Sequence, residues 1–214
     1  MDERAIGIIL RTRLLTETSL IVHWLTPTLG RIATVAKGAR RPKSPFHGKL
    51  DLFFEAEFSF ARSRRSDLHT LREVVLRETH PPLRRDLARL QQATYCAALI
   101  EQTTETETPV PEIFELFNGF LGQVSEEETT PQTVIGFEMR LLGLLGLQPN
   151  LDQSNLRPGT KMLLKRLEAT DWRGSRRLKF SEPQISEAGL YLHGFLIYQF
   201  GKVLKGRSAA LEAK

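Results

Sequence analysis

The stretch Lys37–Lys49, KGARRPKSPFHGK, is the clearest candidate for binding chemistry in this sequence. Its thirteen residues include five Lys/Arg, two Gly, two Pro and no acid. Ammonium and guanidinium groups at this density neutralise phosphates and release their counterions, which gives an affinity that falls steeply with salt. Glycine and proline keep the stretch out of regular structure. We therefore predict a flexible cationic loop that binds polyanions rather than a catalytic centre.

Other side chains extend this candidate site. Phe46 and His47 in the loop are candidates for stacking on exposed bases, as in proteins that bind single strands. Further cations fall on neighbouring predicted strands and on a second polar turn. The candidate nucleic-acid contacts are Arg11, Arg13, Arg31, Lys37, Arg40, Arg41, Lys43, Lys49, Arg64 and Arg65. The alternative is a solvated surface loop, but the clustering of charge favours nucleic acid.

The charge changes sign along the chain. Residues 1–80 hold 14 Lys/Arg against 9 Asp/Glu, a net of +5, whereas residues 81–130 hold 3 against 9, a net of −6. Residues 131–214 return to a net of +6, with 13 against 7. Basic side chains near Trp172 (Arg173, Arg176 and Arg177) are either a second nucleic-acid contact or a loop anchored by the indole. The excess in the first segment is concentrated in one loop, which supports binding of a polyanion.

Patterns typical of catalytic or metal sites are missing from the sequence. The five histidines show no paired spacing, and Cys96 is the single cysteine, on an apolar helical face. No glycine-rich nucleotide loop, nucleophile elbow or HExxH motif occurs. We expect no metal, no cofactor and no enzymatic activity. The sequence contains no apolar run of about 18 residues, and its start lacks the features of a signal peptide. It therefore predicts a soluble, cytoplasmic protein.

The first 80 residues predict strands. Short apolar and β-branched runs cover 5–13, 19–26 and 31–36, and strict alternation follows at 52–61. A fifth strand is predicted at 68–77. Five strands without room for a crossover helix imply antiparallel pairing, and closure into a barrel removes the exposed edges. We predict an OB-type barrel over residues 1–80, with an SH3-like barrel as the competing architecture.

From residue 81 the apolar period becomes helical. Stripes at 83–98, 113–124 and 134–145 predict three helices, with a linker at 103–111. A short helix is predicted at 162–167 and a last helix at about 186–205, apolar almost all round and therefore central. The tail, 205–214, is predicted to fray. The predicted class is α+β, with an all-α domain over residues 81–214 after the barrel.

Three segments of the sequence resemble the RecO recombination mediators of bacteria. They are IILRTRLLTETSLIV, LTPTLGRIATVAKGARRPKS and FEMRLLGLLGLQPNLD. The family fold, an amino-terminal OB barrel followed by a helical domain, agrees with the change of period near Pro81. The resemblance implies a non-enzymatic DNA-repair protein that binds single- and double-stranded DNA and anneals complementary strands. It also implies work with RecR and single-strand-binding protein to load RecA, in the bacterial cytoplasm at the nucleoid.

The resemblance places the DNA surface on Arg11, Arg13, Arg31, Lys37, Arg40, Arg41 and Lys43. Many members carry a four-cysteine zinc module after the position of Asp152, where this chain reads QSNLRPGT. We therefore expect no zinc, and contacts that such a module makes, including one to RecR, are in doubt. A groove for the acidic tail of single-strand-binding protein is predicted near Arg140, Lys161, Lys165 and Arg166. The competing functions are an RNA-binding or ribosome-associated OB protein and an interaction scaffold.

Overall fold

The computed structural model describes residues 2–202 and 204–212. The chain forms two compact units. The first contains residues 1–80 together with 100–115, and the second contains residues 81–99 and 116–214. The long helices α1 (Leu87–Thr103) and α2 (Pro111–Glu126) each contribute residues to both units. The turn of chain between these two helices therefore belongs with the strands.

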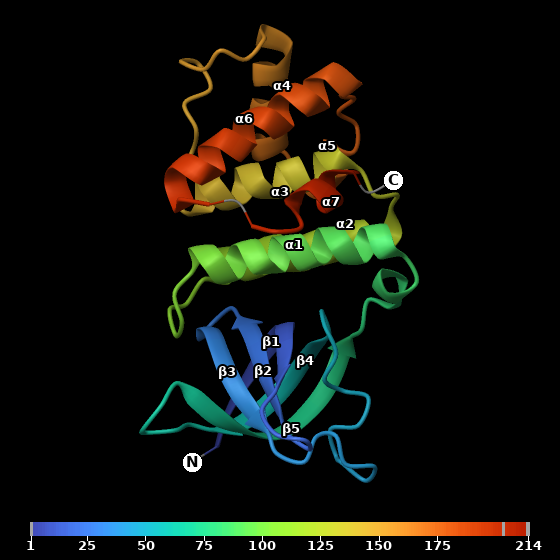
Figure 1. The fold of residues 1–214 in the computed structure, drawn as a ribbon, viewed down its shortest axis with the longest axis vertical. Coiled ribbons are helices and arrows are strands. Elements are labelled where there is room, and N and C mark those ends of the chain that lie inside the picture. Colours follow the sequence, from blue (N-terminus) through green and yellow to red (C-terminus); the bar gives the residue numbers. More distant parts are fainter. Residues whose placement is uncertain (1, 203, 213–214) are drawn as a thin grey trace. The chain divides into compact units, whose positions relative to one another are not determined.

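Five strands of the first unit close into a barrel in the order β1-β2-β3-β5-β4 (Figure 1). Their bounds are β1 Asp2–Leu14, β2 Leu20–Thr26, β3 Gly30–Ala36, β4 Glu55–Ala61 and β5 Leu68–Glu78. The first half of β1 pairs with β4 and its second half with β2, so that one long strand joins both sides of the barrel. Every pair is antiparallel except β3 with β5, which is parallel. The α+β class and the OB-type barrel predicted from the sequence are confirmed.

Aromatic side chains fill the barrel. Trp24 stacks on Phe58 with ring centroids 4.0 Å apart, and its indole Nε1 donates to Thr34 Oγ1 at 2.9 Å. Phe60 stacks on His69 at 5.2 Å. Buried positions alternate with half-buried ones at the starts of β3 and β4, as the period of two requires, whereas β1 has four consecutive buried residues, Gly7–Leu10. The indole N–H is buried with a partner, so the tryptophan fills the core without an unpaired donor.

The predicted strand 52–61 begins three residues late, at Glu55. Phe53 has a positive φ of 64°, a left-handed conformation that cannot continue a strand. Its N–H still donates to Ile9 O at 2.8 Å, and Phe54 O accepts from Ile9 N at 3.0 Å. The alternating side chains gave the correct apolar face but concealed this break in the backbone.

The basic loop between β3 and β4 is more ordered than predicted. Its backbone makes successive turns, with Arg41 N donating to Gly38 O at 3.0 Å and Ser44 N to Arg41 O at 3.0 Å. The same pattern repeats at Lys49 N, which donates to Phe46 O at 3.0 Å. Phe46 is only 6% exposed and belongs to the barrel core. One buried ring and a chain of turns therefore hold the cations in place.

The second unit is helical. Besides the long helices it contains η1 Pro81–Arg84, α3 Pro131–Leu144, α4 Pro158–Ala169, α5 Trp172–Ser175, α6 Glu182–Phe200 and α7 Arg207–Glu212. Helix α3 contacts α4, α6 and α7 (Figure 1). The aromatic centre of the second unit consists of Phe117, Phe120 and Phe137, with ring centroids 5.1 to 6.3 Å apart. No helix in the described part of the chain is both long enough and apolar enough to cross a bilayer.

Two predictions for the C-terminal part were wrong. The tail was expected to fray, but α7 is helical and Arg207 is buried because it pairs with Glu138. Helix α6 was expected to be central, but Leu190 and Tyr198 are 75% and 83% exposed. Only one side of α6, including Leu192 and Leu196, is buried. A helix that is apolar all round in sequence can still leave one side unpacked.

Candidate nucleic-acid interface

Five exposed cations gather where β1 ends and β3 continues into the basic loop. This end cluster consists of Arg13, Lys37, Arg40, Arg41 and Lys43. Arg13 lies beside Ile21 of β2, which in turn pairs with Val35 near the end of β3. Within the described part of the chain none of the five has an acidic partner. The end cluster can therefore meet phosphates without first breaking an ion pair.

Hydrogen bonds between the basic loop and the turn that joins β1 to β2 fix the loop, and with it the positions of these cations. Arg40 N donates to Thr18 O and Arg40 Nη1 to Glu17 O, both at 3.0 Å. Gly38 has a φ of 66° and donates through its N–H to Ser19 Oγ at 3.2 Å. Glycine is favoured where φ is positive, which accounts for this residue directly after Lys37. Backbone contacts fix the loop, while most cationic side chains remain in solvent.

The candidate stacking residues behave differently from one another. Phe46 is part of the barrel core and cannot lie against an exposed base without unpacking, so that suggestion is corrected. His47 is exposed and lines a hollow of about 290 Å³, together with Leu50 and Phe54. From sequence alone, an aromatic residue that anchors a loop by burial, such as Phe46, cannot be distinguished from one that stacks on a base.

Arg11 and Arg31 are placed differently from the end cluster. Arg11 contacts the last turn of α1, whereas Arg31 contacts the connection between α1 and α2, which the sequence predicted as a linker. Arg11 Nη2 lies 3.1 Å from Glu101 Oε1. Arg31 Nε donates to Thr104 Oγ1 at 2.8 Å, and Arg31 Nη2 donates to Thr104 O at 2.5 Å. Two of the predicted DNA contacts are thus engaged within the first unit.

The same connection continues along the barrel beyond Arg31. Glu107 N donates to Arg31 O at 2.9 Å, and its carboxylate contacts Arg62 Nη1 at 2.8 Å and His69 Nε2 at 3.0 Å. Arg62 also pairs with Glu3 at 2.7 Å. We refer to residues Glu101–Thr108 as the acidic segment. Its carboxylates meet cations that the sequence assigned to a DNA surface or to the turn beside it.

The remaining predicted contacts lie elsewhere on the barrel. Lys49 Nζ donates to Val74 O at 3.1 Å, so this ammonium is engaged with β5. Arg64 and Arg65 are exposed on the turn before β5. Because β3 and β5 are parallel, the turn that enters β5 and the loop that leaves β3 project from opposite ends of this strand pair. The structure therefore does not bring Arg64 and Arg65 to the end cluster.

His23 lies on β2 opposite Arg11, and its side chain is 23% exposed. Burial and the positive charges of Arg11, Arg13 and Arg31 lower the pKa of His23 to about 4. Glu101 is 3.9 Å away, too far for a hydrogen bond that would hold a proton on the ring. The imidazole is therefore neutral at pH 7, and the charge of this surface comes from its arginines.

We expect this depressed pKa to make the barrel less stable in mild acid. The unfolded chain takes up a proton on His23 below about pH 6.5, whereas the folded chain does so only near pH 4. Stability is therefore lost as the pH falls between these values, by up to about 3 kcal/mol. Urea titrations at several pH values check this, and His23→Gln should flatten the pH dependence. A His23 resonance that titrates near pH 6.5 in the folded protein would contradict it.

Three of the four predicted partner-binding residues line one hollow of the second unit. Lys161, Lys165 and Arg166 of α4 surround an opening of about 470 Å³ together with exposed Met162. Lys165 pairs with Asp152 at 2.7 Å, which reduces the free charge there. Arg140 is not among the lining residues. Its guanidinium lies 4.1 Å from the Trp172 ring and donates to Thr170 O, and burial lowers the pKa of Arg140 to about 10.

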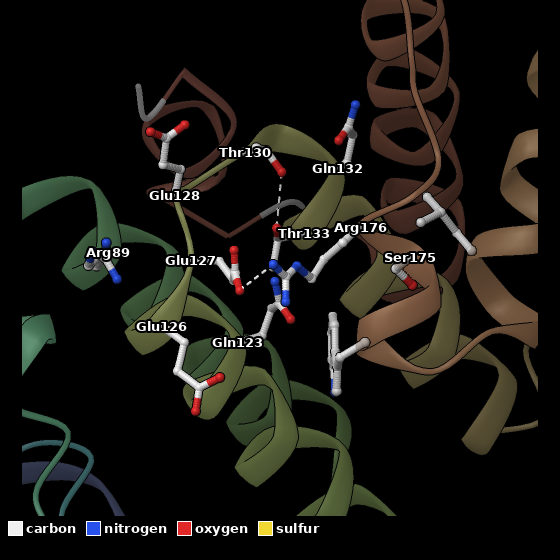
Figure 2. A pocket seen from close by; sticks show the side chains of 13 residues that line it. Arg89, Gln123, Glu126, Glu127, Glu128, Thr130, Gln132, Thr133, Ser175 and Arg176 are labelled. Atoms are coloured by element: carbon white, nitrogen blue, oxygen red, sulfur yellow. Dashed lines mark hydrogen bonds and ion pairs between the residues drawn. The ribbon is translucent and has the colours of Figure 1, made fainter.

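A larger pocket, of about 520 Å³, was not predicted from the sequence (Figure 2). It lies between the end of α2, the start of α3 and α5. Glu127 meets Arg176 across it at 2.5 Å, while Glu126 and Glu128 extend from the same run of chain (Figure 2). Trp172 lines the pocket and packs edge-on against Phe120 at 5.8 Å. The indole is thus a partly buried anchor for its loop, one of the two alternatives left open by the sequence.

Within residues 2–202 and 204–212, no group of three or more His, Cys, Asp or Glu side chains is arranged to hold a metal ion. Cys96 is fully buried, and burial raises the pKa of its thiol well above the usual value. A thiol in that state is a poor nucleophile. The candidate site rests instead on the exposed positive charges of the end cluster, which are suited to binding a polyanion.

A closed OB-type barrel is the architecture of a class of proteins that bind oligonucleotides or oligosaccharides. Family models agree with this architecture. "Recombination protein O N terminal" matches residues 1–80, and "Recombination protein O C terminal" matches residues 84–156. The chain belongs to the RecO family.

Curated relatives carry the name "DNA repair protein RecO". The protein of Rhodopirellula baltica is 36% identical over 67% of this chain and 53% of its own length. That of Syntrophus aciditrophicus is 32% identical over 68% of this chain and 56% of its own length. That of Bacillus subtilis is 35% identical over 68% of this chain and 56% of its own length. The chain thus matches only a little over half the length of these relatives.

Proposed function

We propose that this chain is a recombination mediator of DNA repair that binds single- and double-stranded DNA and anneals complementary strands. Membership of the RecO family supports the repair role. The observation that carries DNA binding is the end cluster, five exposed cations at one end of an OB-type barrel. Annealing requires no bond making, since holding two strands together and screening their repulsion is sufficient. We propose accordingly that the protein is not an enzyme.

The proposed partners follow from the same family. We propose that the protein acts with RecR and single-strand-binding protein to load RecA, in the cytoplasm at the nucleoid. The hollow around Lys161, Lys165 and Arg166 combines cations with exposed Met162. An acidic peptide that ends in apolar residues would find both kinds of contact there. Asp152 pairs with Lys165, so the peptide carboxylates would have to compete with it.

The experiment that tests DNA binding compares single-stranded DNA with RNA of matched sequence at several salt concentrations. We expect affinity for DNA to fall linearly on a log–log plot, with a slope of about −0.7 for each phosphate contacted on a single strand. A slope near zero would leave an interaction scaffold as the function. Tighter binding to RNA at equal salt would point instead to an RNA-binding or ribosome-associated protein.

We expect the hollow on α4 to bind the acidic tail of single-strand-binding protein. Changing Lys161, Lys165 and Arg166 together to alanine should weaken a synthetic tail peptide about tenfold, as expected for loss of charge-assisted contacts. Fluorescence anisotropy of the labelled peptide measures the change. The control is Arg173→Ala with Arg177→Ala and Lys179→Ala, which removes the same charge from exposed positions of the same unit. Equal binding by both variants would place the tail elsewhere.

A further inference from the structure

The surface next to the end cluster is covered by the chain's own acidic segment. Arg11 lies two residues before Arg13 on β1, so both side chains point to the same side of the strand. Arg13 is exposed, whereas Arg11 contacts Glu101 at 3.1 Å. Arg31, two strands away on β3, is held by Thr104. Cations continue from the end cluster along the barrel, but beyond Arg13 the chain occupies them itself.

The segment imitates a strand of a polyanion. Its first three residues form the last turn of α1, and it then runs beside β3 through a parallel bridge between Arg31 and Thr106. Its carboxylates project onto Arg11 at one end and onto Arg62 at the other, at 3.1 and 2.8 Å. Three acids in seven residues, Glu101, Glu105 and Glu107, give it a high density of negative charge. A phosphate backbone presents the same kind of charge at a higher density, about one charge per 3.4 Å of each strand.

The cover is held by contacts that a competitor can replace. The Arg11–Glu101 pair has side chains 38% and 16% exposed, and the Arg62–Glu107 pair has side chains 36% and 38% exposed. An exposed pair such as Arg62–Glu107 contributes little to stability and weakens further in salt, whereas Glu101 is the more buried of the two acids. A cavity of about 130 Å³ lined by Arg11, His23 and Arg31 lies beneath part of the segment, although Thr108 at its end packs directly against Gly30 of β3.

We propose that the acidic segment Glu101–Thr108 is a displaceable cover over a second DNA-contact surface formed by Arg11 and Arg31. The inference rests on the proposed DNA binding and adds a regulation to it. DNA first meets the exposed end cluster, and its phosphates then compete with the segment for Arg11 and Arg31. Displacement extends the contact along β1 and β3. The segment therefore lowers affinity for short or weakly charged ligands and reserves the full surface for a long polyanion.

Neutralising the contacting acid tests this proposal. Glu101→Gln should raise affinity for single-stranded DNA about three- to tenfold at low salt and steepen the log–log salt slope by about 0.7, the value for one phosphate contact. The matched control is Glu105→Gln, because Glu105 is exposed on the same segment and meets no arginine in the described structure. Both variants remove one negative charge, but only Glu101→Gln removes the carboxylate that pairs with Arg11. A difference between the two variants therefore reports the uncovering of Arg11. Adding Arg11→Ala to Glu101→Gln should abolish the gain.

The outcomes separate the two proposals. If wild-type protein shows no salt-dependent DNA binding, both the proposed function and this inference fail. If it binds DNA but Glu101→Gln behaves like Glu105→Gln, the cover is rejected and DNA binding stands. Hydrogen exchange on the wild-type protein gives a second measurement that needs no variant. The Glu107 amide, which donates to Arg31 O, should exchange faster when DNA is bound, and unchanged or slower exchange would also reject the cover.

Discussion

Changing Arg40, Arg41 and Lys43 together to alanine should weaken single-stranded DNA binding at least about tenfold at low salt and flatten the salt slope by about 2. The three side chains are exposed, and within residues 2–202 and 204–212 the Arg40 guanidinium has only a backbone carbonyl, Glu17 O, as its partner. Each would otherwise release about 0.7 counterions from a single strand. Affinities measured by anisotropy between low and moderate salt give both quantities.

The fold should survive this change. The loop is held by backbone hydrogen bonds such as Arg40 N to Thr18 O, and by the buried ring of Phe46, which the substitutions leave in place. Substitutions of exposed side chains away from such contacts usually alter stability by no more than about 0.5 kcal/mol. Thermal unfolding of the triple variant should therefore match that of the wild type. A loss of DNA binding accompanied by unfolding would not count in favour of the loop.

The control variant carries Arg173→Ala, Arg177→Ala and Lys179→Ala. Like the loop variant, it loses two arginines and one lysine, but from exposed positions of the second unit. Net charge falls equally in both variants, so any difference reports the place of the charge and not its amount. We expect the control to keep a salt slope close to that of the wild type. If it flattened the slope as much as the loop variant, general attraction would explain the binding and the end cluster would lose its role.

The barrel could be predicted because each strand is encoded by a run of consecutive apolar or alternating residues. Short apolar runs and one alternating run gave the five strands to within three residues of their ends, and the short spacing between them predicted a closed antiparallel barrel. The parallel pairing of β3 with β5 was not predicted. The fourth strand starts later than predicted because the positive φ of Phe53 breaks it. Nothing in the apolar pattern marks a backbone angle. The cations of the loop were found for the same local reason, since they are consecutive in sequence and exposed.

Pairing between distant residues could not be predicted. Glu101 and Arg11 are 90 positions apart, and Arg31 meets Thr104 across 73 positions. The run TTETETPVP indicates a linker by composition, and composition does not show that its backbone bonds to β3. The burial of Phe46 could not be predicted from the local sequence either. An aromatic side chain in a cationic loop is equally compatible with base stacking and with anchoring, and only burial distinguishes them.

The tail gives the clearest case of a distant partner overriding a local pattern. Its last residues are polar and predicted disorder, but Arg207 Nε and Nη2 donate to the two carboxylate oxygens of Glu138 at 2.6 and 2.8 Å. Arg207 Nη1 donates to Gly189 O at 3.0 Å, and Tyr95 OH donates to Glu138 Oε1 at 2.5 Å. Glu138 is fully buried and Arg207 is 4% exposed. The carboxylate raises the pKa of Arg207, which remains charged at all accessible pH values.

Arg207→Ala should destabilise the helical unit by about 3 to 5 kcal/mol, because it leaves a buried carboxylate without its counter-charge. Urea unfolding followed by far-UV circular dichroism, whose signal comes mainly from helices, measures the loss. Arg166→Ala is the control, since Arg166 is exposed in the same unit and its truncation should cost no more than about 0.5 kcal/mol.

A second variant separates the cost of an orphaned charge from the worth of the ion pair itself. Arg207→Met, Glu138→Leu and Tyr95→Phe together replace the buried polar groups with apolar ones of similar size. Because desolvation of a buried pair offsets much of its attraction, this variant should recover most of the stability that Arg207→Ala loses. Failure to recover would mean that the pair contributes more than its desolvation costs. A loss below about 1 kcal/mol in Arg207→Ala would show that water reaches Glu138 once α7 is released, so that the tail is held by apolar contacts such as Ala210 instead.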